Sequence, residues 1–260
     1  MTIDRQRIVE GLRAIALEAG RAILDIYAHD ITVREKDDRT PVTDADTAAE
    51  DIILARLAEL TPGIPIIAEE QVAAGKVPEI AERFWLVDPL DGTKEFISRN
   101  GEFTVNVALI EAHRPTLGVV YAPAKGRLFL AGPAGASAAA QAPSGTWSAP
   151  HSIGVRAAPA DGLTVVASRS HRDEKTDKYL EQFNVHSVIS AGSSLKFCLV
   201  AAGEADLYPR LGRTMEWDTA AGHAVLAAAG GRVETLDGAS LTYGKAPIFE
   251  NPFFVARGEV

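Results

Sequence analysis

The sequence predicts a mixed α/β protein in which helices cover the faces of β-sheets, and three features of the chain support this. A long amphipathic helix opens the chain, short apolar runs follow one another as a meander in its middle, and strands alternate with helices in its last part. Helices packed on mixed sheets bury all of these apolar surfaces economically. At 260 residues, the chain is long enough for one large α/β domain or two modest ones.

Two helices are predicted at the start of the chain. Apolar residues recur at steps of three and four through residues 4–29, which is the period of a helix with one buried face. Thr43 can cap a second helix whose third position is Asp46, and this pairing forms a capping box. The buried stripe of the second helix is predicted to consist of Ala49, Ile53, Leu57 and Leu60.

Strands are predicted next. Two short apolar runs, 64–68 and 84–87, have the composition of buried strands, and each leads directly into acidic residues. Residues 103–111 alternate in the manner of a longer strand, and the runs 117–121 and 127–131 extend it into an antiparallel meander.

Residues 132–160 are rich in Ala, Gly, Ser and Pro, which indicates a surface hairpin or loop. A subdomain boundary is expected there, between an N-terminal α+β part (residues 1–160) and a C-terminal α/β part (residues 161–260). The C-terminal part is predicted to contain strands at 163–167 and 185–189 and helices at 173–183, 193–202 and 217–230.

Composition excludes several classes of function. Asp and Glu number 35 and Lys and Arg 26, so the formal net charge is −9. This charge argues against nucleic-acid polymers and anionic membranes as partners, whereas a phosphorylated substrate needs metal ions that reverse the local charge. Cys198 is the only cysteine, so a reducing cytoplasm fits. The charged N-terminus is not a signal peptide, and no run reaches the ~18 apolar residues of a membrane span.

The strongest local motif is Asp-Pro-Leu-Asp-Gly-Thr at 88–93. It follows a buried strand, and acids at strand ends in α/β sheets face the crevice where ligands bind. Gly92 permits a sharp turn, so the amides of Gly92 and Thr93 could bind phosphate oxygens. The alternative is an ordinary Pro–Asp–Gly surface turn.

Acids also stand at the ends of other predicted elements, namely Asp46, Glu69, Glu70 and Asp218. If these side chains converge on one cleft, their charges repel, and bound divalent cations would relieve the repulsion. Oxygen ligands favour Mg²⁺ over Zn²⁺. An EF-hand is excluded, because Arg99 or Ala55 would occupy its twelfth position.

The sequence resembles the inositol monophosphatase superfamily of Mg²⁺-dependent, lithium-sensitive phosphatases. Three motifs carry this resemblance: PVTDAD at 41–46, WLVDPLDGT at 85–93 and WDTAAG at 217–222. The likeness covers nearly the whole chain except residues 132–160. It implies a layered α-β-α-β-α sandwich.

The resemblance also implies roles for individual residues. The implied metal ligands are Glu69, Asp88, the carbonyl of Leu90, Asp91 and Asp218. Asp46 matches an outer acid that helps to hold an additional metal and its water, and Thr93 matches the residue that orients the attacking water. Thr93, Asp46 and Glu69 are therefore the implied catalytic residues, and two or three Mg²⁺ ions are expected.

Three longer segments are similar to the bacterial 3′(2′),5′-bisphosphate nucleotidases within this superfamily, at 88–110, 167–171 and 192–210. This likeness favours His171 and Lys196 as substrate contacts. Ser168, just after the predicted strand 163–167, and Gly192, at the start of the helix that carries Lys196, are expected to join them because of these positions. The alternatives are a packed structural histidine at 171 and, at 196, a lysine whose stem covers apolar surface. Lys94 and Glu95 are expected to form a surface pair or to support the loop.

The favoured function is therefore Mg²⁺-dependent hydrolysis of adenosine 3′,5′-bisphosphate to AMP and phosphate, by metal-activated water and without a covalent phospho-enzyme. One alternative is a phosphatase for inositol phosphates or other small phosphomonoesters. The alternative outside catalysis is a Mg²⁺-dependent nucleotide sensor. The expected protein is a cytoplasmic monomer or homodimer whose partner is a small bisphosphonucleotide, and the resemblance also allows peripheral attachment at the inner membrane.

Overall fold

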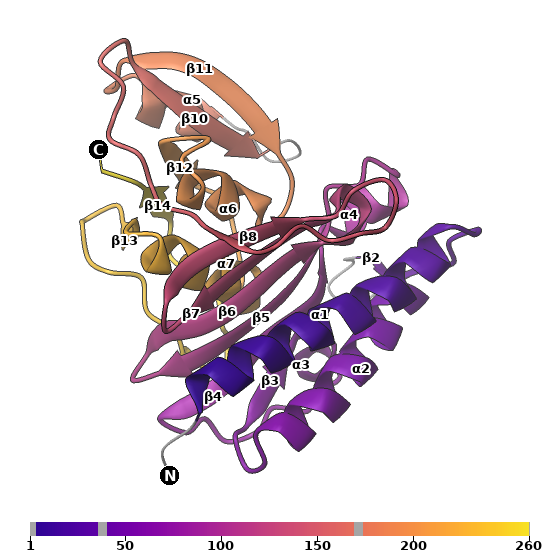
Figure 1. Cartoon of the computed structure of the whole chain (residues 1–260). Coiled ribbons are helices and arrows are strands. Elements are labelled where there is room, and N and C mark those ends of the chain that lie inside the picture. Colours follow the sequence, from indigo (N-terminus) through magenta and orange to yellow (C-terminus); the bar gives the residue numbers. More distant parts are fainter. Residues whose placement is uncertain (1–3, 36–40, 169–173, 260) are drawn as a thin grey trace.

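The computed structural model describes residues 4–35, 41–168 and 174–259, and these form alternating layers of helices and sheets (Figure 1). Helices α1 (Arg5–Tyr27) and α2 (Asp44–Leu60) pack against each other and on one face of the larger sheet. Helices α6 (Leu195–Ala201) and α7 (Glu216–Ala228) fill the middle of the molecule. The layered α/β architecture confirms the fold class predicted from the sequence.

The larger sheet has seven strands in the described part of the chain, in the order β3-β4-β5-β6-β7-β8-β9. Strands β3 and β4 are parallel, and every later pair is antiparallel, so the predicted meander is confirmed. The strand bounds are β3 Ile66–Ala68, β4 Arg83–Asp91, β5 Thr104–Glu111, β6 Arg114–Ala122, β7 Arg127–Gly132, β8 Gly135–Ala140 and β9 His151–Ser152.

The two helices of the outer layer have their apolar faces against this sheet. The capping box predicted for α2 is present, with Thr43 as N-cap and Asp46 as its partner. Trp85 of β4 is fully buried beneath α2, and its indole N–H donates to the hydroxyl of Thr61 at 2.9 Å. A buried indole needs such a partner, so this bond fixes the end of α2 on the sheet.

Helix α7 lies on the opposite face of the larger sheet, and its small residues allow a close approach. A Cβ atom on Gly118 of β6 would lie 2.9 Å from the Cβ of Ala224. The apolar core between the two sheets surrounds α6 and α7 and includes Phe197 and Trp217. Helix α7 is therefore held firmly from both sides, and its N-terminus points toward the end of β4.

The second sheet has the strand order β11-β10-β12-β14-β13 among the described residues. Its bounds are β10 Leu163–Ser168, β11 Val185–Ala191, β12 Leu207–Arg210, β13 Arg232–Thr235 and β14 Phe254–Arg257. Helix α5 (Glu174–Leu180) packs on its outer side through Leu180, against Leu163, Val165 and Leu207. The strands β12, β13 and β14 were not anticipated from the sequence.

The remaining elements are short. Residues 132–160 contain the hairpin of β8 and β9, the first of the two forms predicted for them. The other elements are β1 Val33–Glu35, β2 Pro41–Thr43, α3 Glu69–Ala73, α4 Thr93–Ile97 and the 3₁₀ turn Pro123–Lys125. The subdomain boundary at residue 160 stays a prediction.

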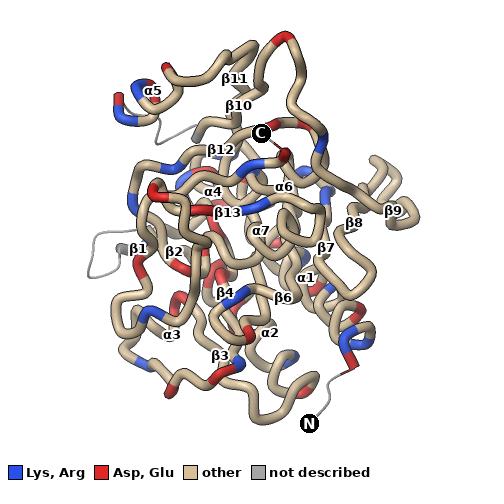
Figure 2. Tube along the Cα trace, turned by 90° about the vertical axis from the view of Figure 1, so that its left-hand side faces the viewer, with Lys and Arg blue, Asp and Glu red and all other residues tan. Residues whose placement is uncertain are grey.

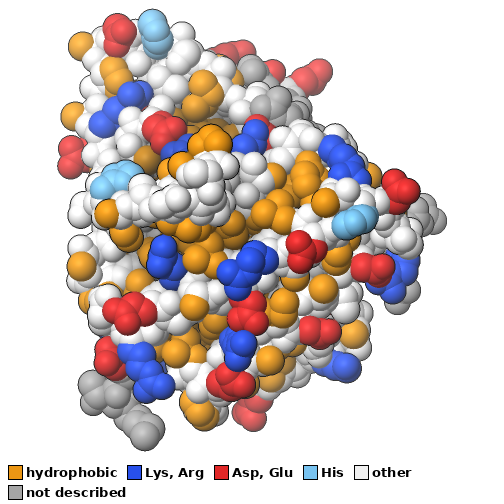
Figure 3. All heavy atoms as spheres, turned by 45° about the vertical axis from the view of Figure 1, so that its right-hand side comes forward, with side chains coloured by type: hydrophobic (Ala, Val, Ile, Leu, Met, Phe, Trp, Pro, Cys, Tyr) orange, Lys and Arg blue, Asp and Glu red, His pale blue; other side chains and the backbone are white. Residues whose placement is uncertain are grey.

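Charge is distributed unevenly through the molecule. On the face seen in Figure 3, basic and acidic side chains are interspersed over the surface. In Figure 2, acidic stretches of the trace lie around β4, near the middle of the molecule. Among the described residues, no helix combines the length and the hydropathy needed to cross a bilayer.

Candidate metal and phosphate site

Strand β4 brings three of the predicted metal ligands to one end of the larger sheet. Its register with β5 shifts between Asp88 and Asp91, which marks a bulge that changes the direction of the side chains. Asp88 is buried, and its Oδ1 accepts a hydrogen bond from the N–H of Leu90 at 3.0 Å. Two carboxylates and the Leu90 carbonyl therefore lie on one short segment.

Gly92 directly follows this bulge, at a position that only glycine can occupy. Its φ angle is 94°, in the left-handed region, and a Cβ there would lie 2.2 Å from the Oγ of Ser193. That same Ser193 hydroxyl donates to the carbonyl of Asp91 at 2.7 Å. The turn is thus packed against the segment before α6, and α4 begins at Thr93.

Asp46 and Thr93 meet although they belong to different elements. Asp46 is 2% exposed, and its Oδ2 accepts hydrogen bonds from the N–H and the hydroxyl of Thr43, both at 2.7 Å. The Thr93 hydroxyl donates to the other oxygen, Oδ1, at 3.2 Å. The capping of α2 therefore holds a carboxylate behind the Thr93 hydroxyl.

Asp218 enters the site from the first turn of α7. Its Oδ2 accepts a hydrogen bond from the N–H of Met215, the N-cap residue, at 2.8 Å. The fully buried Glu216 beside it accepts hydrogen bonds from the N–H groups of Gly244 and Lys245. The helix N-terminus stabilises a carboxylate here, and the 244–245 segment anchors the turn that carries it.

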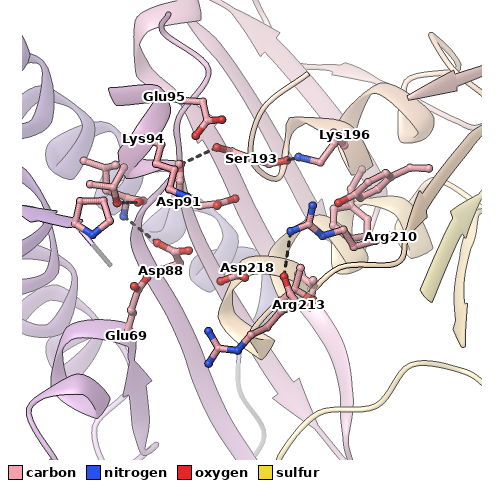
Figure 4. A pocket seen from close by; sticks show the side chains of 18 residues that line it. Glu69, Asp88, Asp91, Lys94, Glu95, Ser193, Lys196, Arg210, Arg213 and Asp218 are labelled. Carbon is pink, nitrogen blue, oxygen red and sulfur yellow. Dashed lines mark hydrogen bonds between the residues drawn. The ribbon is translucent and has the colours of Figure 1, made fainter. Parts of the chain in front are cut away.

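Glu69 is the first residue of α3, directly after β3. Because β3 runs parallel to β4, both strands end on the same side of the sheet, and Glu69 lies near Asp88 (Figure 4). The neighbouring Glu70 N–H donates to Glu50 at 2.9 Å. Burial raises the pKa of Glu50 to about 7.

These elements surround one cavity of about 250 Å³, which Figure 4 shows from close by. The predicted site residues that line it are Glu69, Asp88, Leu90, Asp91, Gly92, Thr93, Lys196 and Asp218. Other lining residues include Glu95, Ser193, Tyr208, Arg210, Arg213 and Thr214. Carboxylates from α3, β4, α4 and α7 thus share the same cavity with basic side chains that include Lys196 and Arg210.

The electrostatics of the cavity follow from burial and repulsion. Burial raises the pKa of Asp91 to about 6, with contributions from Glu95 and Glu69, while Lys196 opposes the shift. The pKa of Asp218 lies well above its ordinary value because of burial and the charges of Asp91 and Glu69. Burial lowers the pKa of Lys196 to about 8, opposed by Asp91. The positive charges nearby therefore do not fully offset the burial of the carboxylates and their mutual repulsion.

The donor set fits a hard divalent cation. Carboxylate and carbonyl oxygens are the ligands that Mg²⁺ prefers, and a cation between Asp91 and Asp218 would relieve their repulsion. Within the described ranges, no group of three or more Asp, Glu, His or Cys side chains is already close enough together to hold an ion.

Comparison with known proteins places this geometry in a family. The model of the inositol monophosphatase family matches residues 4–254 of the chain. The chain belongs to this family. The match spans both sheets and all three motifs on which the resemblance was based, so that resemblance is confirmed.

Relatives within the family include named nucleotidases. The chain is 48% identical over 253 residues to the 3′(2′),5′-bisphosphate nucleotidase CysQ of Salmonella typhimurium, covering 95% of this chain and 98% of the relative. It is also 48% identical over 246 residues to CysQ of Escherichia coli K12, covering 92% and 95%.

Solved structures agree with this placement. CysQ from Bacteroides thetaiotaomicron, a bacterial member of the inositol monophosphatase family, matches with a TM-score of 0.80 at 37% identity, and 100% of each chain is covered. The Thermotoga maritima IMPase matches with a TM-score of 0.74 at 24% identity, covering 95% of this chain and 90% of the other. The second likeness shows the fold alone.

Some of the residues predicted for the site are not among those that line the cavity. Asp46 lies behind Thr93. The N–H of Gly192 donates to the carboxylate of Glu102 at 2.9 Å, so its contact with substrate stays a prediction. The side chain of Ser168, the last residue of β10, and the whole of His171 lie outside the described residues.

Glu95, Arg210 and Arg213 line the cavity, although none of them was predicted as a site residue. Glu95 is 6% exposed, so it does not form the expected surface pair with the exposed Lys94, which also lines the cavity, and support of the loop by Glu95 stays a prediction. Arg210 ends β12, and its guanidinium donates to the carbonyl of Arg213 at 3.0 Å. In the sequence, Arg210 belonged to the segment 192–210, which was noted only for its likeness to the nucleotidases. Strand β12 has four residues, too few for an alternation of polar and apolar side chains to reveal it.

Proposed function

We propose that this member of the inositol monophosphatase family is a Mg²⁺-dependent 3′(2′),5′-bisphosphate nucleotidase, which hydrolyses adenosine 3′,5′-bisphosphate to AMP and phosphate. The 48% identity with the nucleotidase CysQ of S. typhimurium over 95% of the chain carries the proposal. The cavity supports it, because carboxylates lie on one side and Lys196 and Arg210 on the other (Figure 4). A bisphosphate requires both kinds of group.

The acidic side of the cavity would hold the metal. The residues that would hold Mg²⁺ are Glu69, Asp88, Asp91, Asp218 and, through its carbonyl, Leu90. When bound, the ion neutralises charge on the phosphate and lowers the pKa of a coordinated water. The pKa values of Asp91 and Asp218 are raised because burial and the neighbouring carboxylates disfavour their charged forms. A bound cation would offset both effects.

Thr93 is the residue that would orient the attacking water. Its hydroxyl proton is directed to Asp46, so the lone pairs of Thr93 Oγ1 are left to accept a hydrogen bond from a water. Burial of Asp46 and its two bonds from Thr43 keep this direction constant. A water held in this way is aligned before the reaction, which lowers the entropic part of the barrier.

The basic side of the cavity would hold the phosphate that does not react. Lys196 is 5% exposed, and its ammonium donates to the carbonyl of Ser193 at 2.6 Å and lies 5.3 Å from the ring centre of Tyr208. Its charge is therefore fixed in place rather than free in solvent. Arg210 and Arg213 add two guanidinium groups to the same lining, and such groups suit phosphate oxygens.

A phosphate-release assay tests the proposal. Purified protein is incubated with adenosine 3′,5′-bisphosphate, its 3′-phosphosulfate analogue and inositol 1-phosphate, each with Mg²⁺ and with excess EDTA. The proposal predicts Mg²⁺-dependent release that is fastest with a bisphosphonucleotide. Faster release from inositol 1-phosphate would replace the nucleotidase by the other phosphatase considered, and tight nucleotide binding without release would indicate a sensor.

A further inference from the structure

A chain of buried hydrogen bonds joins Asp91 to Asp218 outside the cavity. The side-chain amide of Asn106 donates to Oδ2 of Asp91 at 3.4 Å and to Oγ of Ser194 at 3.1 Å. The hydroxyl of Ser194 in turn donates to the main-chain carbonyl of Asp218 at 2.6 Å. Each amide hydrogen of Asn106 has one acceptor, and the Ser194 oxygen accepts one bond and donates another, so the chain is internally consistent.

This chain connects elements that are far apart in the sequence. Asn106 lies on β5, opposite Asp88 in the register of β4 and β5. Ser194 is the N-cap of α6, and Asp218 belongs to the first turn of α7. Both linking side chains, Asn106 and Ser194, are 1% exposed, so water competes little for their hydrogen bonds.

Residues next to the chain reinforce it. The hydroxyl of Ser193 lies 2.7 Å from the carbonyl oxygens of both Asp91 and Glu102, which share its single proton. The Ser193–Ser194 dipeptide therefore contacts the backbone of Asp91 on one side and the backbone of Asp218 on the other.

We propose that Asn106 and Ser194 are positioning residues that limit how far Asp91 and Asp218 can separate and so keep both available to one metal ion; this inference rests on the proposed function. The two carboxylates repel each other in a buried site, and without a restraint they would turn apart. A donor on Asp91 and a fixed carbonyl on Asp218 oppose that movement. Because the ligands are already ordered before the metal binds, less of the binding free energy is lost in ordering them, and the affinity for the metal is higher.

The alternative is that Asn106 only packs within the sheet. Against this, its side-chain Oδ1 is buried and has no hydrogen-bond partner among the described residues. An unsatisfied buried acceptor is unfavourable, so an apolar side chain of similar size would suit a purely structural position better. What the amide supplies here is the pair of donors to Asp91 and Ser194.

The test uses Asn106→Leu, Ser194→Ala and the double variant, with Val107→Ala as a matched control. Val107 is the next residue of β5, is fully buried, and belongs to the core on the opposite face of the sheet. Mg²⁺ affinity is measured by titration calorimetry and Mn²⁺ affinity by electron paramagnetic resonance, with circular dichroism to confirm folding. Phosphate release is then measured over a range of Mg²⁺ concentrations.

We expect each single variant to bind Mg²⁺ about 10–100-fold more weakly than wild type, as is typical when the outer partner of a ligand is removed. Because the two residues form one chain, the loss in the double variant should be smaller than the product of the two single losses. High Mg²⁺ should restore much of the activity. Val107→Ala should lower thermal stability and leave metal affinity within twofold of wild type.

Two results would overturn the inference while leaving the proposed function intact. One is wild-type metal affinity in both single variants, and the other is an equal loss of affinity in Val107→Ala. If Asn106→Leu does not fold, Ser194→Ala removes a single oxygen atom and decides the question alone. A wild-type protein that neither binds Mg²⁺ nor releases phosphate would overturn the proposed function and this inference together.

Discussion

The hydroxyl of Thr93 donates a hydrogen bond to Oδ1 of Asp46 at 3.2 Å, although 47 residues separate the two in the chain. The same carboxylate caps α2 by accepting hydrogen bonds from Thr43. A local feature of helix capping therefore fixes the direction of a hydroxyl in the cavity. This relationship joins the start of one helix to the proposed alignment of the attacking water.

Replacing Thr93 by Val keeps the shape of the side chain and removes the hydroxyl. We expect kcat to fall about 10²–10⁴-fold, the range typical of a lost group in proton transfer, with little change in KM. Thr93→Ser is the matched control, because it keeps the hydroxyl, and it should retain most of the activity. Steady-state kinetics that show less than a tenfold loss in Thr93→Val would remove Thr93 from the mechanism.

Replacing Asp91 by Asn keeps the size of the side chain and removes its charge. We expect metal-dependent turnover to be lost while the metal-free protein becomes at least as stable as wild type, since a buried repulsion is removed. The pKa of Asp91 is raised to about 6, so the stabilising effect should grow as the pH rises toward that value and should persist above it. Urea unfolding in EDTA at pH 5 and pH 7.5 measures it. A less stable variant at pH 7.5 would contradict this account of the site.

Replacing Lys196 by Met keeps the length of the stem and removes the ammonium group. We expect KM for adenosine 3′,5′-bisphosphate to rise more than kcat falls, with a loss of about 1–3 kcal/mol in kcat/KM. Lys178→Met, on the exposed side of α5, removes the same charge and should have no effect. A loss of kcat at unchanged KM would instead place Lys196 at the reacting phosphate.

His223 predicts a pH dependence of stability that is independent of the cavity. Burial, with a smaller contribution from Arg114, lowers its pKa to about 4, and its ring contacts the Tyr243 hydroxyl at 3.0 Å. A lowered pKa in the folded state means that stability is complete above the ordinary value near 6.5 and is lost as the pH falls toward 4. This loss amounts to about 3 kcal/mol. Asp91, Asp218 and Glu50, whose pKa values are raised, contribute with the opposite sign over the same pH range in both proteins. Urea unfolding from pH 7 to pH 4 should therefore show the His223 loss as a change in the difference between the free energies of unfolding of wild type and His223→Gln. Equal pH profiles would contradict it.

The sequence predicted those parts of the site that depend on local patterns. The capping box of Thr43 and Asp46 was predictable because its two residues lie three apart. Acids at the ends of β3 and β4 were predictable because buried strands precede them directly. Parallel pairing of these two strands then brings Glu69 and Asp88 to the same side of the sheet.

Other parts of the site depend on packing that no local pattern encodes. Glu95 was expected in a surface pair or as a support of the loop, and it is buried because the segment before α6 lies against it, so that a Cβ on Gly192 would be 3.1 Å from its Cγ. Arg210 reaches the cavity only because β12 pairs with β10 and β14, and four residues are too few to reveal a period. The role of Asn106 likewise appears only when Asp91 and Ser194 meet around it.

The most direct test of the central claim is the course of adenosine 3′,5′-bisphosphate hydrolysis in ¹⁸O-labelled water, followed by ³¹P nuclear magnetic resonance with Mg²⁺ present. The account predicts loss of the 3′-phosphate signal alone, one ¹⁸O atom in the released phosphate, unlabelled AMP as the other product, and no reaction in EDTA. Release of the 5′-phosphate, release without metal, or an intact substrate after incubation with folded, Mg²⁺-loaded protein would contradict it.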